Sequence, residues 1–142
     1  MQHQAKGISR TFVAVPAGTE EVADYRVAGY GDIEETSILG YFALASAFLL
    51  ADDLAPELAK RYPRQIPVTR LGRLAIRSDL HSQGLGRLLL ADAISRSRNA
   101  ALSVGSAGIF VDAKDHEAAR FYAGYGFTAC KDQALKLYLP MW

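Results

Sequence analysis

The stretch that most constrains this chain is an apolar run that breaks into a Gly-x-Gly turn and continues as a helical pattern. The run Leu71–Ile76 has the composition of a buried strand, and the turn Gly84-Leu85-Gly86 follows it. Beyond the turn, apolar residues recur at helical spacing. Such an arrangement leaves backbone N–H groups bare at the helix start, where the helix dipole favours an anion. The stretch therefore predicts a phosphate-binding turn.

The chain has the size of one globular domain. Its 142 residues are enough to bury a sizeable core, so we expect a single domain over residues 1–142. The longest apolar run, Ile38 to Ala51, has 14 residues, short of the roughly 18 that a membrane span needs. The first residues contain no apolar signal core, and the single Cys130 cannot form an internal disulfide. We therefore expect a cytoplasmic protein with no membrane partner.

Charge divides along the chain, although the formal net charge is only +1. Residues 19–58 hold nine acidic residues and one basic residue, whereas residues 60–98 hold nine basic residues and two acidic ones. We expect residues 19–35 to form an exposed acidic excursion. The glycine turn lies in the basic block, which favours a polyanionic ligand. The small net charge argues against wholesale nucleic-acid binding.

The hydrophobic pattern predicts an α/β or α+β sheet with helices packed on it. Four stretches read as strands: Ser9–Val15, Thr69–Arg77, Ile109–Val111 and Ala134–Leu139. Two more are ambiguous, because Ser37–Leu50 is a buried strand or a helix and Tyr25–Tyr30 is a strand or a loop. Three stretches read as helices: Gly84–Leu102, Asp115–Tyr125 with Asp115 as its cap, and Asp53–Lys60 with Asp52 or Asp53 as its cap.

Two motifs resemble the signatures of the GNAT superfamily of acetyl-CoA-dependent N-acetyltransferases. The cofactor signature of that family, Gln/Arg-x-x-Gly-x-Gly/Ala at a strand-to-helix turn, reads here His81-Ser82-Gln83-Gly84-Leu85-Gly86. His81 stands where the signature has Gln or Arg. The second element, a helix ending in Phe/Leu-Tyr before Gly-Phe, reads Phe121-Tyr122-Ala123-Gly124-Tyr125-Gly126-Phe127. The two motifs occur in the family's order.

Within that superfamily, Pro67–Ile76 followed by Gln83–Leu89 resembles the GNAT toxins of bacterial toxin–antitoxin pairs. The resemblance covers roughly residues 8–139 apart from residues 19–35. It implies acetyl-CoA as cosubstrate, transfer to the α-amine of an aminoacyl-tRNA with arrest of translation, and a small DNA-binding antitoxin as partner. Whether the chain forms a homodimer stays open.

The resemblance also implies a fold. It is a GNAT-like mixed, mostly antiparallel sheet with flanking helices, in which Leu71–Ile76 splays from Ile109–Val111 to admit the cofactor. The family's N-terminal strand and helices are expected to be lacking here.

The resemblance assigns roles to particular residues. Cofactor binding is expected from Leu74, Ala75 and Ile76 for the pantetheine arm, and from His81, Ser82, Gln83, Gly84, Leu85, Gly86 and Arg87 for the pyrophosphate. Tyr122 is the expected general acid, because the leaving thiolate needs a proton and a hydroxyl with a pKa of roughly 10 can donate it. The alternative is a core tyrosine. The charge pattern, rather than the resemblance, makes Arg64, Arg73 and Arg77 candidates for contacts with the tRNA backbone, and a solvated charged face is the alternative.

Other chemistries fit the sequence less well. No carboxylate suggests itself as general base, but an α-amine with a pKa of roughly 8 is partly neutral in the cytosol and needs little help. His81 and His116 are better read as surface or cap residues. No partner for Ser82 or Cys130 supports nucleophilic or zinc chemistry, so no metal is expected. Two alternatives stay open: an N-acetyltransferase for a small amine or protein N-terminus, and a non-catalytic CoA- or partner-binding domain.

Overall fold

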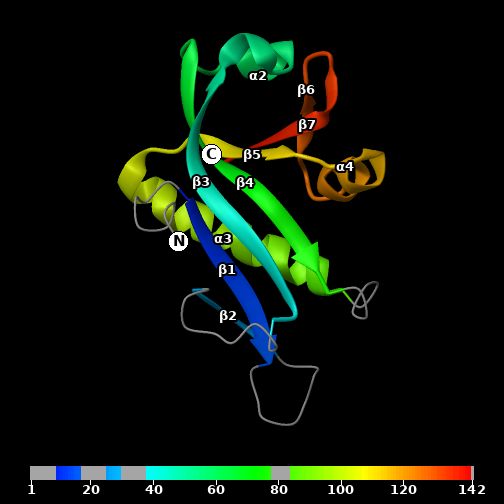
Figure 1. The fold of residues 1–142 in the computed structure, drawn as a ribbon. Helices are drawn as coiled ribbons and strands as arrows, with labels where there is room; N and C mark the ends of the chain where they lie inside the picture. The colour runs from blue at the N-terminus through cyan, green and yellow to red at the C-terminus, as the bar shows by residue number, and fades with distance from the viewer. Residues whose placement is uncertain (1–8, 17–24, 30–37, 78–83, 142) are drawn as a thin grey trace. The chain divides into compact units, whose positions relative to one another are not determined.

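The computed structural model describes residues 9–16, 25–29, 38–77 and 84–141 (Figure 1). The chain forms two compact units, one from residues 1–45 and 72–96 and the other from residues 46–71 and 97–142. Strands β3 (Gly40–Leu50) and β4 (Gln65–Ile76) and helix α3 (Leu85–Val104) each contribute residues to both. No helix among the described residues is long and apolar enough to cross a membrane.

The first unit is built on antiparallel strands. Strand β1 (Ser9–Pro16) pairs on one side with β2 (Tyr25–Gly29) and on the other with β3, in a register that sets Phe12 opposite Phe42. Strand β4 lies next to β3, giving the order β2-β1-β3-β4. The Arg77 N–H, just past the end of β4, donates a 2.8 Å hydrogen bond to the Leu39 carbonyl oxygen.

Helix α3 packs its first half against these strands. Leu89, Leu90 and Ala93 are buried, as the helical spacing of the sequence predicts. The rings of Phe12 and Phe42 stack with their centroids 5.3 Å apart, and the Arg96 guanidinium carbon lies 4.4 Å from the Phe12 ring centroid. This cation–π contact fixes the helix to β1.

The second unit contains the first part of β4 together with β5 (Gly108–Asp112), β7 (Gln133–Pro140) and β6 (Thr128–Cys130), in the order β4-β5-β7-β6. Thr69–Leu71 of β4 pair in parallel with Ile109–Val111 of β5. The pairs β5–β7 and β6–β7 are antiparallel. The sheet is therefore mixed and mostly antiparallel, which confirms the expected fold class.

Short helices and a compact core complete the second unit. Helix α2 (Pro56–Ala59) follows a 3-10 turn at Ala51–Asp53, and helix α4 (His116–Ala123) lies between β5 and β6. The core cluster consists of Ala51, Leu54, Ile66, Val68, Phe110, Cys130 and Tyr138. Strand β5 reads as a short apolar run without alternation because Ile109, Phe110 and Val111 are all buried.

The structure settles both ambiguous stretches. Residues 40–50 form a strand rather than a helix, and residues 25–29 form strand β2. The rest of the expected acidic excursion at residues 19–35 lies outside the described residues.

Several expectations were wrong in detail. Helix α2 begins at Pro56 after Ala55 as N-cap, so Asp52 and Asp53 do not cap it. Proline suits this first helical position because it has no N–H to satisfy. Leu88 and Leu102, expected on the buried face of α3, are 45% and 75% exposed. Leu71 is paired with Val111, so any divergence of β4 from β5 starts after it.

Candidate active site

Gly84 forms the turn that begins helix α3. Its φ of 82° lies in the left-handed region, which residues with a side chain seldom adopt. The Gly84 carbonyl oxygen accepts a 3.2 Å hydrogen bond from the Leu88 N–H. The N–H groups of Leu85, Gly86 and Arg87 therefore precede Leu88, the first N–H donor of the helical ladder, and lie at the positive end of the helix dipole.

The electrostatics of this helix start also suit an anion. The first turn of α3 contains no acidic residue, and Arg87 is exposed there. Leu85 is buried and anchors the turn. The structure thus brings together the described half of the expected pyrophosphate site, Gly84 to Arg87. His81, Ser82 and Gln83 lie outside the described residues, and their roles stay predictions.

The end of β4 presents its backbone in two directions. The Arg77 N–H donates to the carbonyl oxygen of Leu39, just before the start of β3. Because backbone groups alternate along a strand, those of Ala75 face β3 and those of Leu74 face the opposite edge. Leu74, Ala75 and Ile76 are all partly buried. A Cβ on Gly40 would lie 2.8 Å from the Ala75 carbonyl oxygen. Glycine at position 40 is therefore what lets β3 approach β4 this closely.

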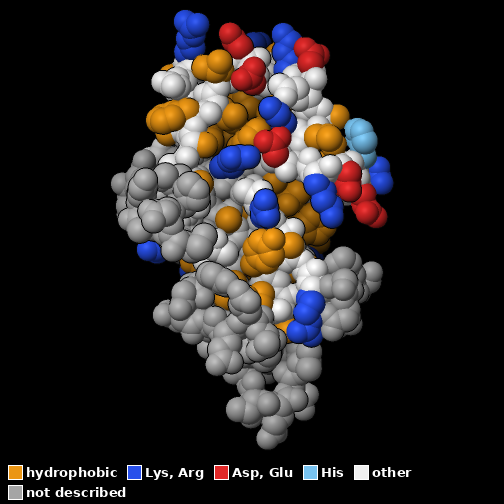
Figure 2. All heavy atoms as spheres, in the orientation of Figure 1, with side chains coloured by type: hydrophobic (Ala, Val, Ile, Leu, Met, Phe, Trp, Pro, Cys, Tyr) orange, Lys and Arg blue, Asp and Glu red, His pale blue; other side chains and the backbone are white. Residues whose placement is uncertain are grey.

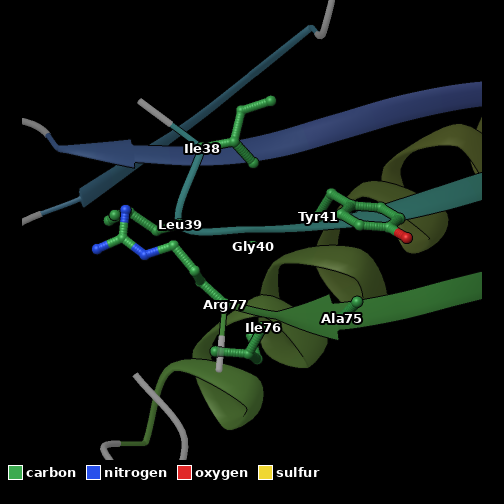
Figure 3. A pocket seen from close by; sticks show the side chains of 7 residues that line it. All are labelled: Ile38, Leu39, Gly40, Tyr41, Ala75, Ile76 and Arg77. Atoms are coloured by element: carbon green, nitrogen blue, oxygen red, sulfur yellow. The ribbon is translucent and has the colours of Figure 1, made fainter. Parts of the chain in front are cut away.

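A cavity of about 220 Å³ opens where β3 begins and β4 ends. Its lining comes from Ile38, Leu39, Gly40, Tyr41, Ala75, Ile76 and Arg77 (Figure 3). Figure 3 shows the Tyr41 ring and the Arg77 guanidinium on opposite sides of Gly40. The sequence does not single out Ile38 and Tyr41, because no motif marks them. Ile38 lies just before β3 and Tyr41 lies on it, and only the pairing of β3 with β4 brings them to the cavity.

Tyr122 lies on helix α4, whose start is fixed as the sequence predicts. The Asp115 Oδ1 accepts a 2.8 Å hydrogen bond from the Ala118 N–H, which makes Asp115 the N-cap. The helix ends in a turn in which the Phe127 N–H donates to the Tyr122 carbonyl oxygen. Gly126, with φ of 99°, allows that reversal.

The Tyr122 side chain sits among aromatic rings. It is only 6% exposed, and its ring centroid lies 5.3 Å from that of Phe121 and 5.5 Å from that of Phe127. Burial raises the pKa of Tyr122 to about 12. The hydroxyl therefore keeps its proton at every physiological pH and can act as a hydrogen-bond donor. Its role as general acid stays a prediction.

The three arginines expected to contact the substrate, Arg64, Arg73 and Arg77, are exposed. Arg64 immediately precedes β4, and its carbonyl oxygen accepts a hydrogen bond from the Ala51 N–H. Lys and Arg side chains are interspersed with hydrophobic ones over the face shown in Figure 2. Among the described residues, no group of His, Cys, Asp and Glu is placed to hold a metal ion.

Known proteins resemble this chain in sequence and in structure. A curated relative, a tRNA-acetylating toxin of Mycobacterium tuberculosis (strain ATCC 25618 / H37Rv), is 36% identical over 104 residues. That stretch is 73% of this chain and spans only 63% of the relative's length.

Two solved structures are similar as well. AtaT complexed with acetyl-methionyl-tRNAfMet is 30% identical with a TM-score of 0.74, over 98% of this chain and 74% of AtaT. A tyrosine-to-phenylalanine mutant of the AtaT toxin, bound to the C-terminus of the antitoxin AtaR and to acetyl-CoA, is 28% identical with a TM-score of 0.67. That match covers 99% of this chain and 72% of the mutant.

The family model for the acetyltransferase (GNAT) domain matches residues 57–141, which is more than half of the chain. This match includes the glycine turn, helix α3 and Tyr122, and the strand order fits the expected fold. The chain therefore belongs to the GNAT acetyltransferase family.

Proposed function

We propose that this chain transfers the acetyl group of acetyl-CoA to the α-amine of an aminoacyl-tRNA. The observation that carries the proposal is its similarity, at 30% identity or more, to two proteins described by that chemistry. One is named a tRNA-acetylating toxin, and the other was solved with an acetylated aminoacyl-tRNA. An enzyme of this kind would block translation and work in the cytoplasm.

The described residues fit acetyl-CoA at two places. The N–H groups of Leu85, Gly86 and Arg87 at the start of α3 would bind the pyrophosphate, since that helix start carries no carboxylate to compete. The backbone of Leu74 faces the edge of β4 away from β3, where it would pair with the amides of the pantetheine arm. When bound, acetyl-CoA supplies an activated thioester.

Tyr122 would supply the hydrogen-bond donor for the leaving sulfur. With a pKa of about 12, its hydroxyl is protonated whenever the substrate binds. Full transfer of that proton to a thiolate of lower pKa is unfavourable, so the hydroxyl would act chiefly by hydrogen bonding to the developing negative charge. The AtaT structure with acetyl-CoA carries a tyrosine-to-phenylalanine change, which supports a functional role for a tyrosine in this family.

The acceptor amine needs little help from a general base. An α-amine has an unperturbed pKa of roughly 8, so a useful fraction is neutral near pH 7.5. Arg64, Arg73 and Arg77 would contact the phosphates of the tRNA. By analogy with AtaT and AtaR, a small antitoxin would be the protein partner.

An acceptor panel tests the proposal. The full chain is incubated with radiolabelled acetyl-CoA and charged tRNA, uncharged tRNA, a free amine or a short peptide. We expect label only in the charged tRNA, and we expect mild alkali, which cleaves the aminoacyl ester, to remove it. Label in the amine or peptide would instead favour the small-acceptor alternative. Binding of acetyl-CoA with no transfer to any acceptor would favour a non-catalytic binding domain.

A further inference from the structure

A buried hydroxyl joins β4 to β5 where the two strands begin to pair. The Ser106 side chain is only 5% exposed; its hydroxyl accepts a 3.0 Å hydrogen bond from the Thr69 hydroxyl and donates a 3.1 Å bond to the Gly108 carbonyl oxygen. One hydroxyl can serve both bonds, because it has one proton to donate and lone pairs to accept. These three residues, which we call the hydroxyl joint, all belong to the second unit.

The backbone pairing beside the hydroxyl joint is short. Thr69–Leu71 of β4 pair in parallel with Ile109–Val111 of β5. The Ala107 N–H adds a 2.8 Å hydrogen bond to the Pro67 carbonyl oxygen. Parallel pairing is slightly less stable per residue than antiparallel pairing, and three residues supply few backbone bonds. A fully satisfied buried hydrogen-bond network makes the groups that it joins more rigid. The hydroxyl joint therefore helps to fix β5 against β4.

The two strands lead to different parts of the proposed reaction. Strand β4 continues to Leu74, whose backbone would pair with the pantetheine arm. Strand β5 leads into helix α4, which carries Tyr122, and both β5 and α4 contact β7 within the second unit. The leaving sulfur would belong to a cofactor held by β4, whereas its hydrogen-bond donor follows β5. A change in how β5 is held to β4 would therefore move the donor relative to the sulfur.

We propose that Thr69 and Ser106 are positioning residues, which set the place of the Tyr122 hydroxyl by fixing β5 against β4. The inference rests on the proposed function and adds two residues to it. Both residues act through Tyr122 rather than by touching a substrate. Catalytic rates depend steeply on such placement, since a misplacement of about 1 Å caused far from the chemistry can lower a rate by about 10²-fold.

The test compares two variants of Thr69 in the full chain. Thr69→Val removes the hydroxyl and keeps a β-branched side chain of similar shape, whereas Thr69→Ser keeps the hydroxyl. We expect Thr69→Val to lower kcat with charged tRNA by roughly tenfold, within the range for a small misplacement, and to leave the KM for acetyl-CoA nearly unchanged. Thr69→Ser should retain most of the original kcat. The original kcat in Thr69→Val, or an equal loss in Thr69→Ser, would overturn the inference.

A double-mutant cycle with Tyr122→Phe separates positioning from a general loss of folded protein. If the hydroxyl joint acts through the Tyr122 hydroxyl, Thr69→Val should change kcat by less than about twofold in an enzyme that already lacks that hydroxyl. Partial unfolding would instead lower kcat by the same factor with and without the Tyr122 hydroxyl. Equal factors in the two backgrounds would overturn the inference.

Ser97→Ala is the matched control for Ser106→Ala. Ser97 is also buried, at 1% exposed, and its hydroxyl has no hydrogen-bond partner in the part of the chain that the structure describes. We expect Ser106→Ala to lower kcat as Thr69→Val does and Ser97→Ala to leave it unchanged. Equal effects of the two serine variants would overturn the inference and leave the proposed function standing. If the original chain acetylates no charged tRNA, the proposed function fails and the inference fails with it.

Discussion

At the scale of single residues, Tyr122 combines burial with a polar hydroxyl. Its ring packs against Phe121 and Phe127, and its pKa of about 12 keeps the hydroxyl neutral. Packing alone would be served equally well by phenylalanine. A catalytic role and a structural role are therefore separated by removing the oxygen and leaving the ring.

We predict that Tyr122→Phe lowers kcat by roughly 10²- to 10³-fold, the usual contribution of one hydrogen-bond donor to a developing negative charge, with little change in the KM for acetyl-CoA. Steady-state kinetics with charged tRNA measures both parameters. Tyr125→Phe is the control, since Tyr125 lies three residues further on and is 42% exposed. A Tyr122→Phe enzyme with the original kcat would show that Tyr122 is a packing residue.

Cys130 gives a prediction for stability at alkaline pH. Burial, together with the carboxylates of Asp53 and Asp112, raises the pKa of this thiol from 9.0 to about 11, against a smaller opposing effect of Lys136. Between these values the unfolded chain gives up a proton that the folded chain keeps. Raising the pH from 9 to 11 therefore favours unfolding, by up to about 3 kcal/mol for two pKa units.

Urea unfolding of the original chain and of Cys130→Ala, measured from pH 8 to pH 11, checks this sign. We expect the original chain to lose more stability over that range, because the variant has no thiol to titrate. Ionisation of tyrosines affects both proteins alike. Parallel declines in the two free energies of unfolding would contradict the raised pKa of Cys130.

At the scale of secondary-structure elements, helix α4 positions Tyr122, and Asp115 fixes where that helix begins. The hydrogen bond from the Ala118 N–H satisfies one of the donors left open in the first turn. The helix has only eight residues, so one capped donor is a large share of its open N–H groups. Its start should therefore depend on this cap.

We predict that Asp115→Ala destabilises the protein by about 1 kcal/mol and that Asp115→Asn, which can still accept the bond, does so by much less. Asp52→Ala is the control, since Asp52 is exposed and caps no α-helix. The denaturant concentration at the midpoint of unfolding measures the difference in stability, provided that the dependence of the unfolding free energy on denaturant is the same in each variant. Equal effects of Asp115→Ala and Asp52→Ala would argue against the cap.

The elements that the sequence predicted well carry strong local signals. Helix α3 follows a helical period of apolar residues, and α4 follows an N-cap. Strand β6 was missed because it has only three residues, of which Thr128 and Ala129 are exposed. Strand β3 was ambiguous because Tyr41, Ala43 and Ala45 on one face are about as apolar as Phe42 and Leu44 on the other, so the run has no period of two.

The candidate site divides in the same way. The glycine turn and Tyr122 belong to motifs, so the sequence alone could propose them. Ile38 and Tyr41 could not be proposed in this way, because their place in the cavity depends on the pairing of β3 with β4, which joins residues far apart in the chain. The helical period of apolar residues also predicted burial wrongly for Leu88 and Leu102, which are exposed. A helical period shows which residues share a face, but not how far along the helix other elements cover that face.

At the scale of the whole molecule, the distribution of basic residues along the chain bears on whether the acceptor is a tRNA. The chain is nearly neutral, yet nine basic residues fall between positions 60 and 98. If Arg64 and Arg73 each contact a phosphate, replacing either with alanine should reduce the slope of log affinity against log salt by about one.

Filter binding of charged tRNA at several salt concentrations measures this slope. Arg10→Ala is the control, because Arg10 is exposed and lies outside the basic block. An unchanged slope in the Arg64 and Arg73 variants would show that these residues do not contact tRNA phosphates.

The proposed reaction leaves the acetyl group on the α-nitrogen of an aminoacyl-tRNA. The most direct test is to incubate the full chain with acetyl-CoA and charged tRNA, digest the RNA, and identify the terminal nucleoside by mass spectrometry. We predict adenosine carrying an N-acetylaminoacyl group, formed only when both substrates are present. The proposed reaction would be contradicted if only unmodified aminoacyl adenosine were recovered while the same enzyme preparation acetylated another amine.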